Sequence, residues 1–182
     1  MVSVEERRVP TALAPDFRAI FERESSYVWN CLRRLGVRAS DLEDLAHEVF
    51  MTVHLKLAEY DPARPLRPWL FGISFRVASD HRRRAYHHRE RGDVDIEPVD
   101  PAVPADEQLA AEQSRRLLMA ALDALDLDRR AVVVLHEIDG IAMPEVATTL
   151  GIPLNTAYSR LRLAREQLQA AVRRLRASNG AP

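Results

Sequence analysis

The sequence contains a single cysteine, Cys31, among 182 residues. One thiol cannot form an internal disulfide and is too few for a cysteine zinc site, so a reducing compartment such as the cytoplasm fits best. Long apolar runs are also missing, because none approaches the roughly 18 residues of a membrane span. The first residues, MVSVEERRVPTAL, lack the apolar core of a secretory signal. These absences predict a soluble cytoplasmic protein with no membrane insertion.

Lysine is almost missing, and neither sign of charge is in excess. Lys56 is the only lysine, and the 27 acidic residues balance the 26 basic ones to a net charge of −1. Arginine suits bidentate contacts to phosphates and guanines, although a GC-rich genome would give the same bias. Total charge therefore says nothing about nucleic acid, and any such indication must come from how the charge is distributed.

Sequence patterns of catalysis and cofactor binding are absent as well. We find no glycine-rich phosphate loop, no nucleophile paired with a base, and no metal-ligand pattern. His81, His87 and His88 have no cysteine or carboxylate cluster beside them and fit a basic surface better. We therefore expect a protein that is not an enzyme and that binds no cofactor or metal.

Apolar residues recur at helical spacing nearly throughout, and no segment shows convincing strand alternation. Residues 13–91 are predicted to form one helical bundle and residues 111–177 a second helical domain. Residues 92–108 between them contain six acidic residues, no basic ones and three prolines. This composition predicts a flexible acidic linker over residues 92–110, longer than an ordinary surface loop. The expected fold is all-α, with two small helical domains.

Residues 145–165 combine the features of a helix-turn-helix. Gly151 suits the positive φ of a sharp turn, Pro153 stops the first helix, and Asn155 can cap the second. One side of the second helix is predicted to be buried, and it consists of Ala157, Leu161, Ala164, Leu168 and Val172.

The other side of this second helix is rich in arginine and allows two interpretations. It is either a DNA-contacting face or the solvated face of a helical hairpin. From Asn155 to Arg176 there are six arginines and one acid, Glu166, whereas a solvated helix usually mixes both signs. The charge therefore favours DNA contact, with base edges met by the first turns and phosphates by the helix edges.

An acidic helix face in the first domain is a second candidate surface. The segment DLEDLAHEVF places Asp41, Asp44 and Glu48 on one side of a helix, with His47 beside them. Such a face suits a basic partner, and a plain solvated face explains it equally well.

Residues 65–84 combine aromatic and basic side chains. The aromatic residues can stack on exposed bases while arginines hold the backbone, or they can simply pack in the core. Taken alone, core packing is the more common outcome. The residues in question are Trp69, Phe71, Phe75, Arg76, Arg82, Arg83 and Arg84.

Together these segments resemble bacterial RNA polymerase sigma factors of the extracytoplasmic-function type, in the sigma-70 family. Region 2 of that family has an acidic AED-L-x-Q-E-x-F helix followed by WL-x-x-I and D-x-x-R-R, and this chain has LEDLAHEVF, WLFGI and DHRRR. Region 4 has EIA-x-x-L-G followed by T-V-x-S-R-L-x-R-A-R, and this chain has EVATTLG and TAYSRLRLAR. The resemblance covers roughly residues 13–91 and 111–175.

The resemblance implies a factor that binds core RNA polymerase and promoter DNA to initiate transcription, and that an anti-sigma factor holds inactive. The acidic face would dock on the β′ clamp helices through Asp41, Asp44, His47 and Glu48, and the second domain would sit on the β flap. The −10 element would be contacted and opened by the segment from Trp69 to Arg84. The −35 element would be read by Tyr158, Ser159 and Arg162 and its phosphates held by Thr156, Arg160 and Arg165.

This sequence departs from the family pattern at four positions. His47 replaces a glutamine, Arg76 an asparagine, Ala142 a capping serine or threonine, and Tyr158 a basic residue of the reading helix. The promoter sequence therefore does not carry over from the family. A free-standing helix-turn-helix regulator, which would need no polymerase, is the alternative function, and the first-domain motifs argue against it.

Overall fold

The structure is a computed structural model that describes residues 16–89 and 106–179. Every regular element in these two ranges is helical, which confirms the all-α prediction. Most of the predicted linker, residues 92–105, lies outside the described residues. The elements in chain order are α1 (Phe17–Arg34), η1 (Ala39–Asp41), α2 (Leu42–Lys56), η2 (Leu57–Glu59), α3 (Leu66–Arg89), α4 (Asp106–Leu122), α5 (Leu127–Val133), η3 (Val134–Ile138), α6 (Met143–Leu150) and α7 (Leu154–Asn179).

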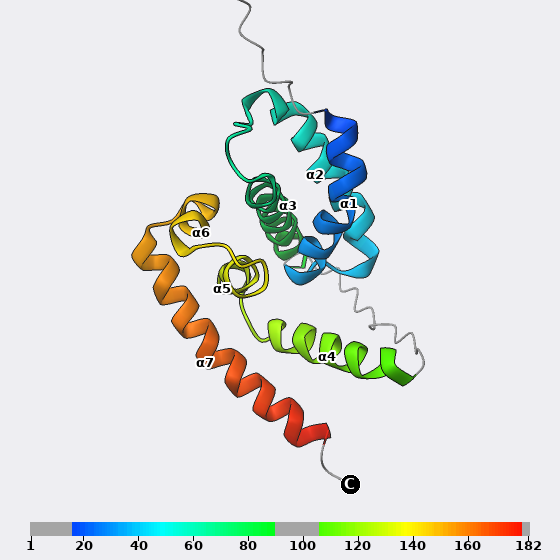
Figure 1. Cartoon of the computed structure of the whole chain (residues 1–182). Coiled ribbons are helices and arrows are strands. Elements are labelled where there is room, and N and C mark those ends of the chain that lie inside the picture. Colours follow the sequence, from blue (N-terminus) through cyan, green and yellow to red (C-terminus); the bar gives the residue numbers. More distant parts are fainter. Residues whose placement is uncertain (1–15, 90–105, 180–182) are drawn as a thin grey trace, which may run out of the picture.

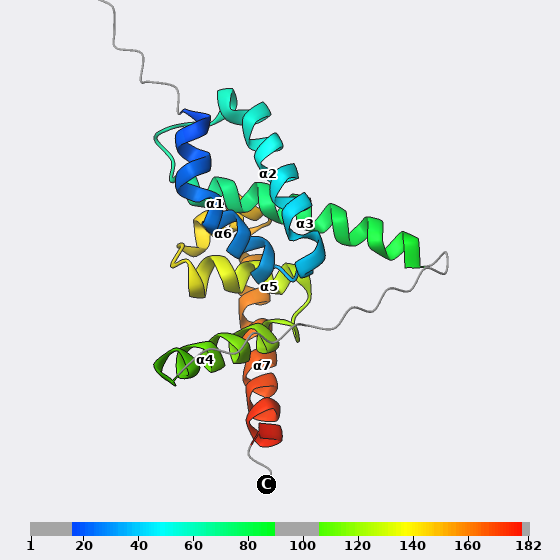
Figure 2. The ribbon, with the colours of Figure 1, turned by 90° about the vertical axis from the view of Figure 1, so that its right-hand side faces the viewer.

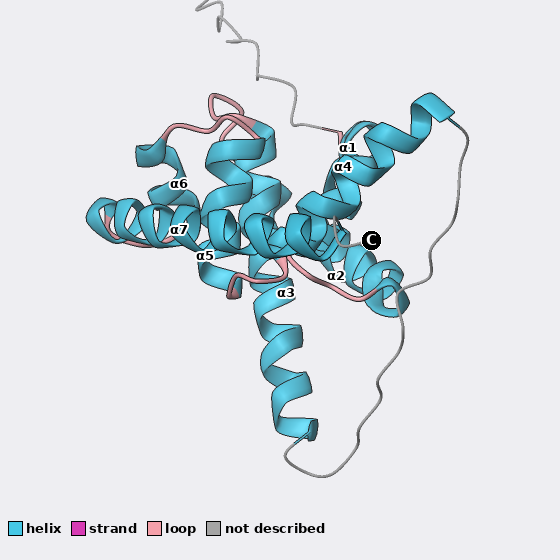
Figure 3. Ribbon diagram, turned by 90° about the horizontal axis from the view of Figure 1, so that it is seen from below, coloured by secondary structure: helices cyan, strands magenta, loops and turns pink. Residues whose placement is uncertain are grey.

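The first domain packs α1, α2 and α3 around one core, as Figure 1 shows. Asp16 caps α1 by accepting a hydrogen bond from the backbone N–H of Arg18 at 3.0 Å. The helix stops before Gly36, whose φ of +87° reverses the chain at no steric cost. Apolar side chains at helical spacing then fill the interior, and fully buried ones include Val28, Leu32, Val49, Val53, Leu70 and Phe71. The C-terminal turns of α3 extend away from the rest of the molecule (Figures 2 and 3).

In the second domain, the long helix α7 crosses α4 and α5, and α6 lies beside its first turns (Figure 2). Helix α5 continues into a π-helical turn, η3, and ends at Gly140, whose φ is +72°. Gly140 was predicted to be a helix cap, and the backbone N–H of Ile141 donates back to the carbonyl of Leu135 as such a cap requires. This turn places Asp139 on the surface that faces the first domain.

Helix α4 begins earlier than the sequence pattern indicated. Its first residue is Asp106, so residues 106–110 are helical although they were assigned to the linker. The reason is local chemistry: after Asp106, EQLAAEQ consists of good helix formers, and acidic residues in a first turn interact favourably with the helix dipole. The prolines that suggested a linker all precede this point.

The helix-turn-helix forms between α6 and α7. Gly151 adopts a φ of +66°, as expected for its sharp turn. Ala142 precedes α6 and provides no side-chain cap, in line with the departure noted above. The capping role predicted for Asn155 is wrong, because α7 begins at Leu154 and the carbonyl of Pro153 accepts the first helical hydrogen bond, from the N–H of Ala157 at 3.0 Å. Proline has a φ that is compatible with entry into a helix, so the helix starts one residue before Asn155.

The two domains touch each other along one side. Helix α3 packs against α6, and α5 with η3 lies near the end of α1 (Figures 1 and 2). The sequence pattern predicted two separate domains and gave no indication of this contact.

Candidate functional site

The first turns of α7 present a polar face to solvent. Ala157, Leu161 and Ala164 are buried on the opposite side and fix the rotation of the helix. Tyr158 is 51% exposed and the side chain of Arg162 is 67% exposed. The hydroxyl of Ser159 is used locally, because it donates to the carbonyl of Thr156 at 3.0 Å. The exposed face is therefore the one that the sequence pattern indicated.

The three arginines of this face each form an ion pair. Arg160 contacts Asp128 at 2.6 Å, and Arg162 contacts Glu166 at 2.8 Å. Nε of Arg165 contacts Glu137 at 2.8 Å. Exposed ion pairs of this kind stabilise by only about 0–1 kcal/mol, so a phosphate can replace the carboxylate at little cost. Sequence reasoning missed Asp128 and Glu137, because α5 and η3 bring them in from distant positions.

The acidic side of α2 is exposed, but part of it is paired within the domain. Asp44 and His47 are exposed. Asp41 contacts Nε2 of His81 at 3.0 Å, and Glu48 contacts Nη2 of Arg84 at 3.2 Å. Two of the predicted polymerase contacts therefore lie against the basic half of α3.

The same side of α2 continues into apolar residues that sequence reasoning missed. Met51 is 64% exposed and Leu55 is 74% exposed. They follow Asp44 and Glu48 at intervals of three and four residues, so all four side chains share one side of the helix. Neighbouring exposed apolar residues, unlike single scattered ones, favour a protein-contacting surface, and Met51 and Leu55 are neighbours on the helix. The sequence could have indicated these two residues, because their helical spacing places them on the same side of the helix as the acidic residues.

The aromatic residues of α3 differ in burial. Phe71 is fully buried, which fits core packing, the alternative that the sequence left open. Trp69 is partly buried, and its ring lies 4.8 Å from that of Tyr60 between centroids. Phe75 is also partly buried, at the edge of the core. The structure thus leaves two of the three aromatic side chains within reach of an outside ligand.

The basic residues of α3 lie on its exposed side. Arg76 and Arg82 are exposed, and Arg83 is exposed although it contacts Asp80 at 2.7 Å. Arg84 is likewise exposed beside Glu48. The C-terminal half of α3 is therefore an exposed basic segment, in which Arg83 and Arg84 are paired with Asp80 and Glu48.

Neither a metal site nor a membrane helix is found in the part of the chain that the structure describes. Within residues 16–89 and 106–179, no three histidine, cysteine, aspartate or glutamate side chains gather as metal ligands would. No helix in those ranges combines the length and the apolar character needed to cross a bilayer.

Comparison with known proteins identifies both domains. Residues 20–88 match the family description "Sigma-70 region 2", and residues 115–168 match "Sigma-70, region 4". RNA polymerase sigma factor NccH of Alcaligenes xylosoxydans xylosoxydans is 31% identical over 175 residues, which cover 92% of this chain and 94% of NccH. The ECF RNA polymerase sigma factor SigE of Mycolicibacterium smegmatis is 32% identical over 160 residues, which cover 87% of this chain and 62% of SigE.

A solved structure has the same fold. It is that of the sigma factor RpoE in complex with the anti-sigma factor NepR from Bartonella quintana, with a TM-score of 0.66 and 23% identity. The similarity covers 87% of this chain and 97% of that one. With matches to both regions and relatives that extend over nearly its full length, the chain belongs to the sigma-70 family of RNA polymerase sigma factors and is of the extracytoplasmic-function type.

Proposed function

We propose that the chain binds core RNA polymerase and directs it to promoters, with α3 at the melted −10 element and α7 at the −35 element. The observation that carries this proposal is the presence of both sigma regions, each with an exposed basic helix, in one chain. A cytoplasmic location follows from the function, because the polymerase and the chromosome are there. The factor contributes binding specificity, and the catalysis belongs to the polymerase.

The −35 contact uses the first turns of α7. Arg162 is the best candidate for a bidentate contact to guanine, with Tyr158 and Ser159 beside it on the exposed face. Thr156, Arg160 and Arg165 would hold the phosphates. Asp128 and Glu137 already hold Arg160 and Arg165 in place, so their side chains lose little conformational freedom when a phosphate takes over.

The −10 contact uses the exposed side of α3. Trp69 and Phe75 would stack on unpaired bases. This stacking stabilises by about 1–3 kcal/mol per base and so offsets part of the free energy needed to unstack the bases from the duplex. Arg76, Arg82, Arg83 and Arg84 would hold the strand. Phe71 supports this surface from the core, because it is fully buried beneath it.

Two protein partners complete the proposal. Asp41, Asp44, His47 and Glu48 would dock on the β′ clamp helices, with Met51 and Leu55 adding apolar contact area along the same side of α2. The second domain would sit on the β flap. An anti-sigma factor is proposed as the regulator, which the resemblance implies and the complex of RpoE with NepR supports.

Transcription in vitro tests the function directly. The purified chain is mixed with core polymerase and a genomic fragment library, and transcript starts are mapped. We expect starts at a defined set of sites that share two spaced sequence elements. Core polymerase alone is the control. Specific promoter binding by the chain without polymerase, and no starts with it, would instead support the free-standing regulator.

Replacement of Arg162 by alanine should relax the preference at one or two −35 positions. A bidentate contact discriminates between bases by about 1–3 kcal/mol, so we expect roughly 5- to 150-fold less discrimination there. The measurement is transcription from promoters with single −35 substitutions. Arg174→Ala is the matched control, because it removes the same charge from a later turn of α7. Equal weakening on all promoters would place Arg162 on a phosphate.

A further inference from the structure

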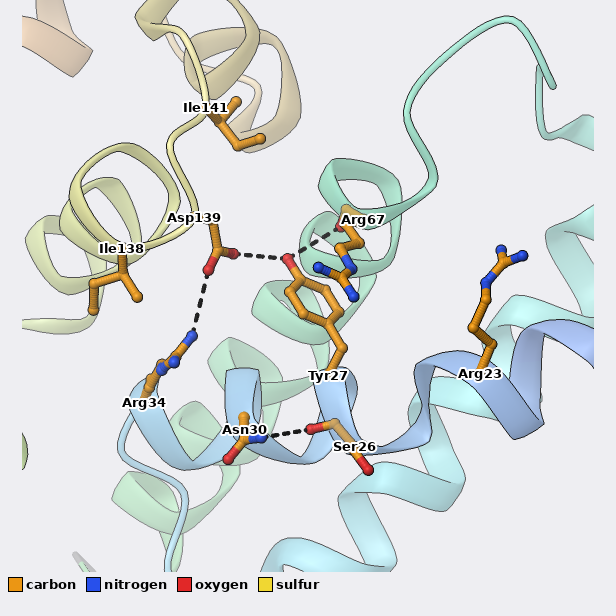
Figure 4. A pocket seen from close by; sticks show the side chains of 9 residues that line it. All are labelled: Arg23, Ser26, Tyr27, Asn30, Arg34, Arg67, Ile138, Asp139 and Ile141. Atoms are coloured by element: carbon orange, nitrogen blue, oxygen red, sulfur yellow. Dashed lines mark hydrogen bonds and ion pairs between the residues drawn. The ribbon is translucent and has the colours of Figure 1, made fainter. Parts of the chain in front are cut away.

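One side of α1 is polar along most of its length and lines a cavity. Arg23, Tyr27, Asn30 and Arg34 follow one another at intervals of three and four residues, so they share this side of the helix. The cavity has a volume of about 460 Å³, within the range of sites that hold small organic molecules (Figure 4). None of these four residues belongs to the sets proposed above to contact DNA or polymerase. The cavity is therefore a candidate for a separate ligand site.

Two arginines of the cavity are held by one buried carboxylate, that of Glu24. Its Oε1 accepts a hydrogen bond from Nε of Arg23 at 2.9 Å, and its Oε2 accepts one from Nε of Arg67 at 3.0 Å. Arg67 comes from α3, and its Cζ also lies 5.0 Å from the centre of the Tyr27 ring, in a cation–π contact. Both guanidinium groups are fixed through Nε, which leaves their Nη groups for other partners.

Asp139 contributes a carboxylate to the cavity, and this carboxylate already has two partners. Its Oδ1 lies 3.3 Å from Nη1 of Arg34, and its Oδ2 accepts a hydrogen bond from the hydroxyl of Tyr27 at 2.8 Å (Figure 4). Burial, and then the neighbouring Cys31 and Asp139, raise the pKa of Tyr27 far above its usual range, so the hydroxyl stays protonated and remains a donor. Asp139 therefore repels an incoming anion less than an unpaired carboxylate would.

The cavity retains both positive charge and unused donors. Three guanidinium groups are paired with only two carboxylates, those of Glu24 and Asp139, so one positive charge is left over. Within residues 16–89 and 106–179, these guanidinium groups have no other hydrogen-bond partner. A guanidinium binds carboxylate and phosphate oxygens in the same fork geometry. One fork satisfies a carboxylate, whereas the three terminal oxygens of a phosphate accept from several, so three arginines in one cavity favour phosphate.

The opposite wall is apolar, because Ile138 and Ile141 line it with partly exposed side chains. A close fit lies beside this wall: Arg130 of α5 is 4% exposed and packs against Gly36, in the turn after α1. A Cβ at position 36 would overlap Nη1 of Arg130 and lie 3.1 Å from its Cζ, so a side chain there would displace the guanidinium. A molecule in the cavity thus meets charged donors on one side and apolar carbon atoms on the other.

We propose that this cavity binds a small phosphorylated molecule, whose phosphates contact the guanidinium groups of Arg23, Arg34 and Arg67 and whose organic part packs against Ile138 and Ile141. Figure 4 shows Arg23 and Arg34 towards opposite ends of the cavity, with Arg67 between them, so a ligand with two phosphates can engage more than one of the arginines. A nucleoside diphosphate has this chemistry, and ADP is a suitable probe. The site goes beyond the proposed function and does not depend on it.

Isothermal titration calorimetry of the full chain with ADP and with pyrophosphate tests the proposal. We expect ADP to bind, and pyrophosphate to bind more weakly because it has no organic part. Arg67→Lys keeps a positive charge beside Glu24 but has no fork, so its affinity for ADP should fall by about tenfold or more. Arg18→Lys is the matched control and should bind ADP as the native chain does, because Arg18 is an exposed arginine of α1 outside the cavity.

Nuclear magnetic resonance of isoleucine methyl groups locates the bound molecule. We expect ADP to shift the methyl signals of Ile138 and Ile141 and to leave those of Ile73 and Ile152 in place, because the latter two do not line the cavity. Thermal denaturation shows whether Arg67→Lys is folded, and Arg23→Lys, at a more exposed position, replaces it if it is not. Absence of ADP binding to the native chain, or equal affinity in the native and variant chains, overturns the proposal.

A short single-stranded oligonucleotide distinguishes a free phosphorylated molecule from a phosphate of DNA. We expect ADP to bind in a manner that requires Arg67 and to stay bound when the oligonucleotide is added. If the oligonucleotide binds in a manner that requires Arg67 and ADP does not bind, a DNA phosphate occupies the cavity and the proposal is overturned. These titrations measure no transcription, so their failure would leave the proposed function standing, and failure of that function would leave this site standing.

Discussion

Replacement of Phe71 by alanine should lower the free energy of unfolding by about 3–5 kcal/mol, the range for truncating a fully buried aromatic side chain. Phe71 is the bulkiest side chain that the structure buries completely, and it lies in the core of the first domain. The loss combines the transfer of the ring to water with the cavity that it leaves. Urea denaturation of the full chain, followed by circular dichroism, measures this change.

Two companion variants separate a core role of Phe71 from a role in stacking. Phe71→Leu keeps an apolar side chain of moderate size, so it should fold and direct transcription at a level near that of the native chain. Phe75 is partly exposed in the native chain. The variant Phe75→Ala should therefore lose less stability than Phe71→Ala, and it should impair promoter opening. If Phe71→Ala proved as stable as the native chain yet failed to open promoters, the residue would belong to the DNA-contacting surface.

Replacement of Asp123 by alanine is the second change expected to have a large effect. Nη2 of Arg130 contacts Asp123 at 2.9 Å, while the guanidinium itself is buried. Burial lowers the pKa of Arg130 and Asp123 opposes that change, so the carboxylate compensates the buried charge. Loss of one partner of a buried pair costs about 3–5 kcal/mol, and we expect about 3 kcal/mol because Asp123 is itself largely exposed.

The double variant Asp123→Ala/Arg130→Met provides the control. Methionine has an apolar stem of similar length and no charge, so it should recover most of the lost stability in thermal or urea denaturation. An equal loss in the single and double variants would show that Asp123 acts by packing or by local hydrogen bonding. The charge of Arg130 would then have no part in the effect.

Local features of this fold could be predicted from the sequence because they depend on neighbouring residues. Gly140 and Gly151 adopt the positive φ angles that their places after helical stripes indicated. Of the side of α7 that was predicted to be buried, Ala157, Leu161 and Ala164 are buried, whereas Leu168 and Val172 further along are only partly buried. Asn155 was mistaken for a cap because asparagine is found both at caps and within first turns, and α7 in fact begins one residue earlier, at Leu154.

The candidate sites could be predicted only as residue types. The sequence indicated Arg160 and Arg165, but their partners Asp128 and Glu137 come from another helix and depend on how α7 crosses it. It indicated three aromatic residues on α3, yet the burial of Phe71 depends on where α1 and α2 pack. The pairing of Tyr27 with Asp139 has no sequence signal, because neither residue belongs to a motif.

The fit of Arg130 against Gly36 has a consequence for how such chains can be recombined. A hybrid that joins this first domain to the second domain of a relative would inherit only one half of a matched pair. If the relative has a short residue where this chain has Arg130, the hybrid leaves a hole above Gly36. In the reverse hybrid, a relative's side chain in place of Gly36 would overlap Nη1 of Arg130, so the guanidinium would have to move. The two domains carry separate sequence motifs, but the surfaces by which they touch fit each other. A functional hybrid should therefore exchange both domains together.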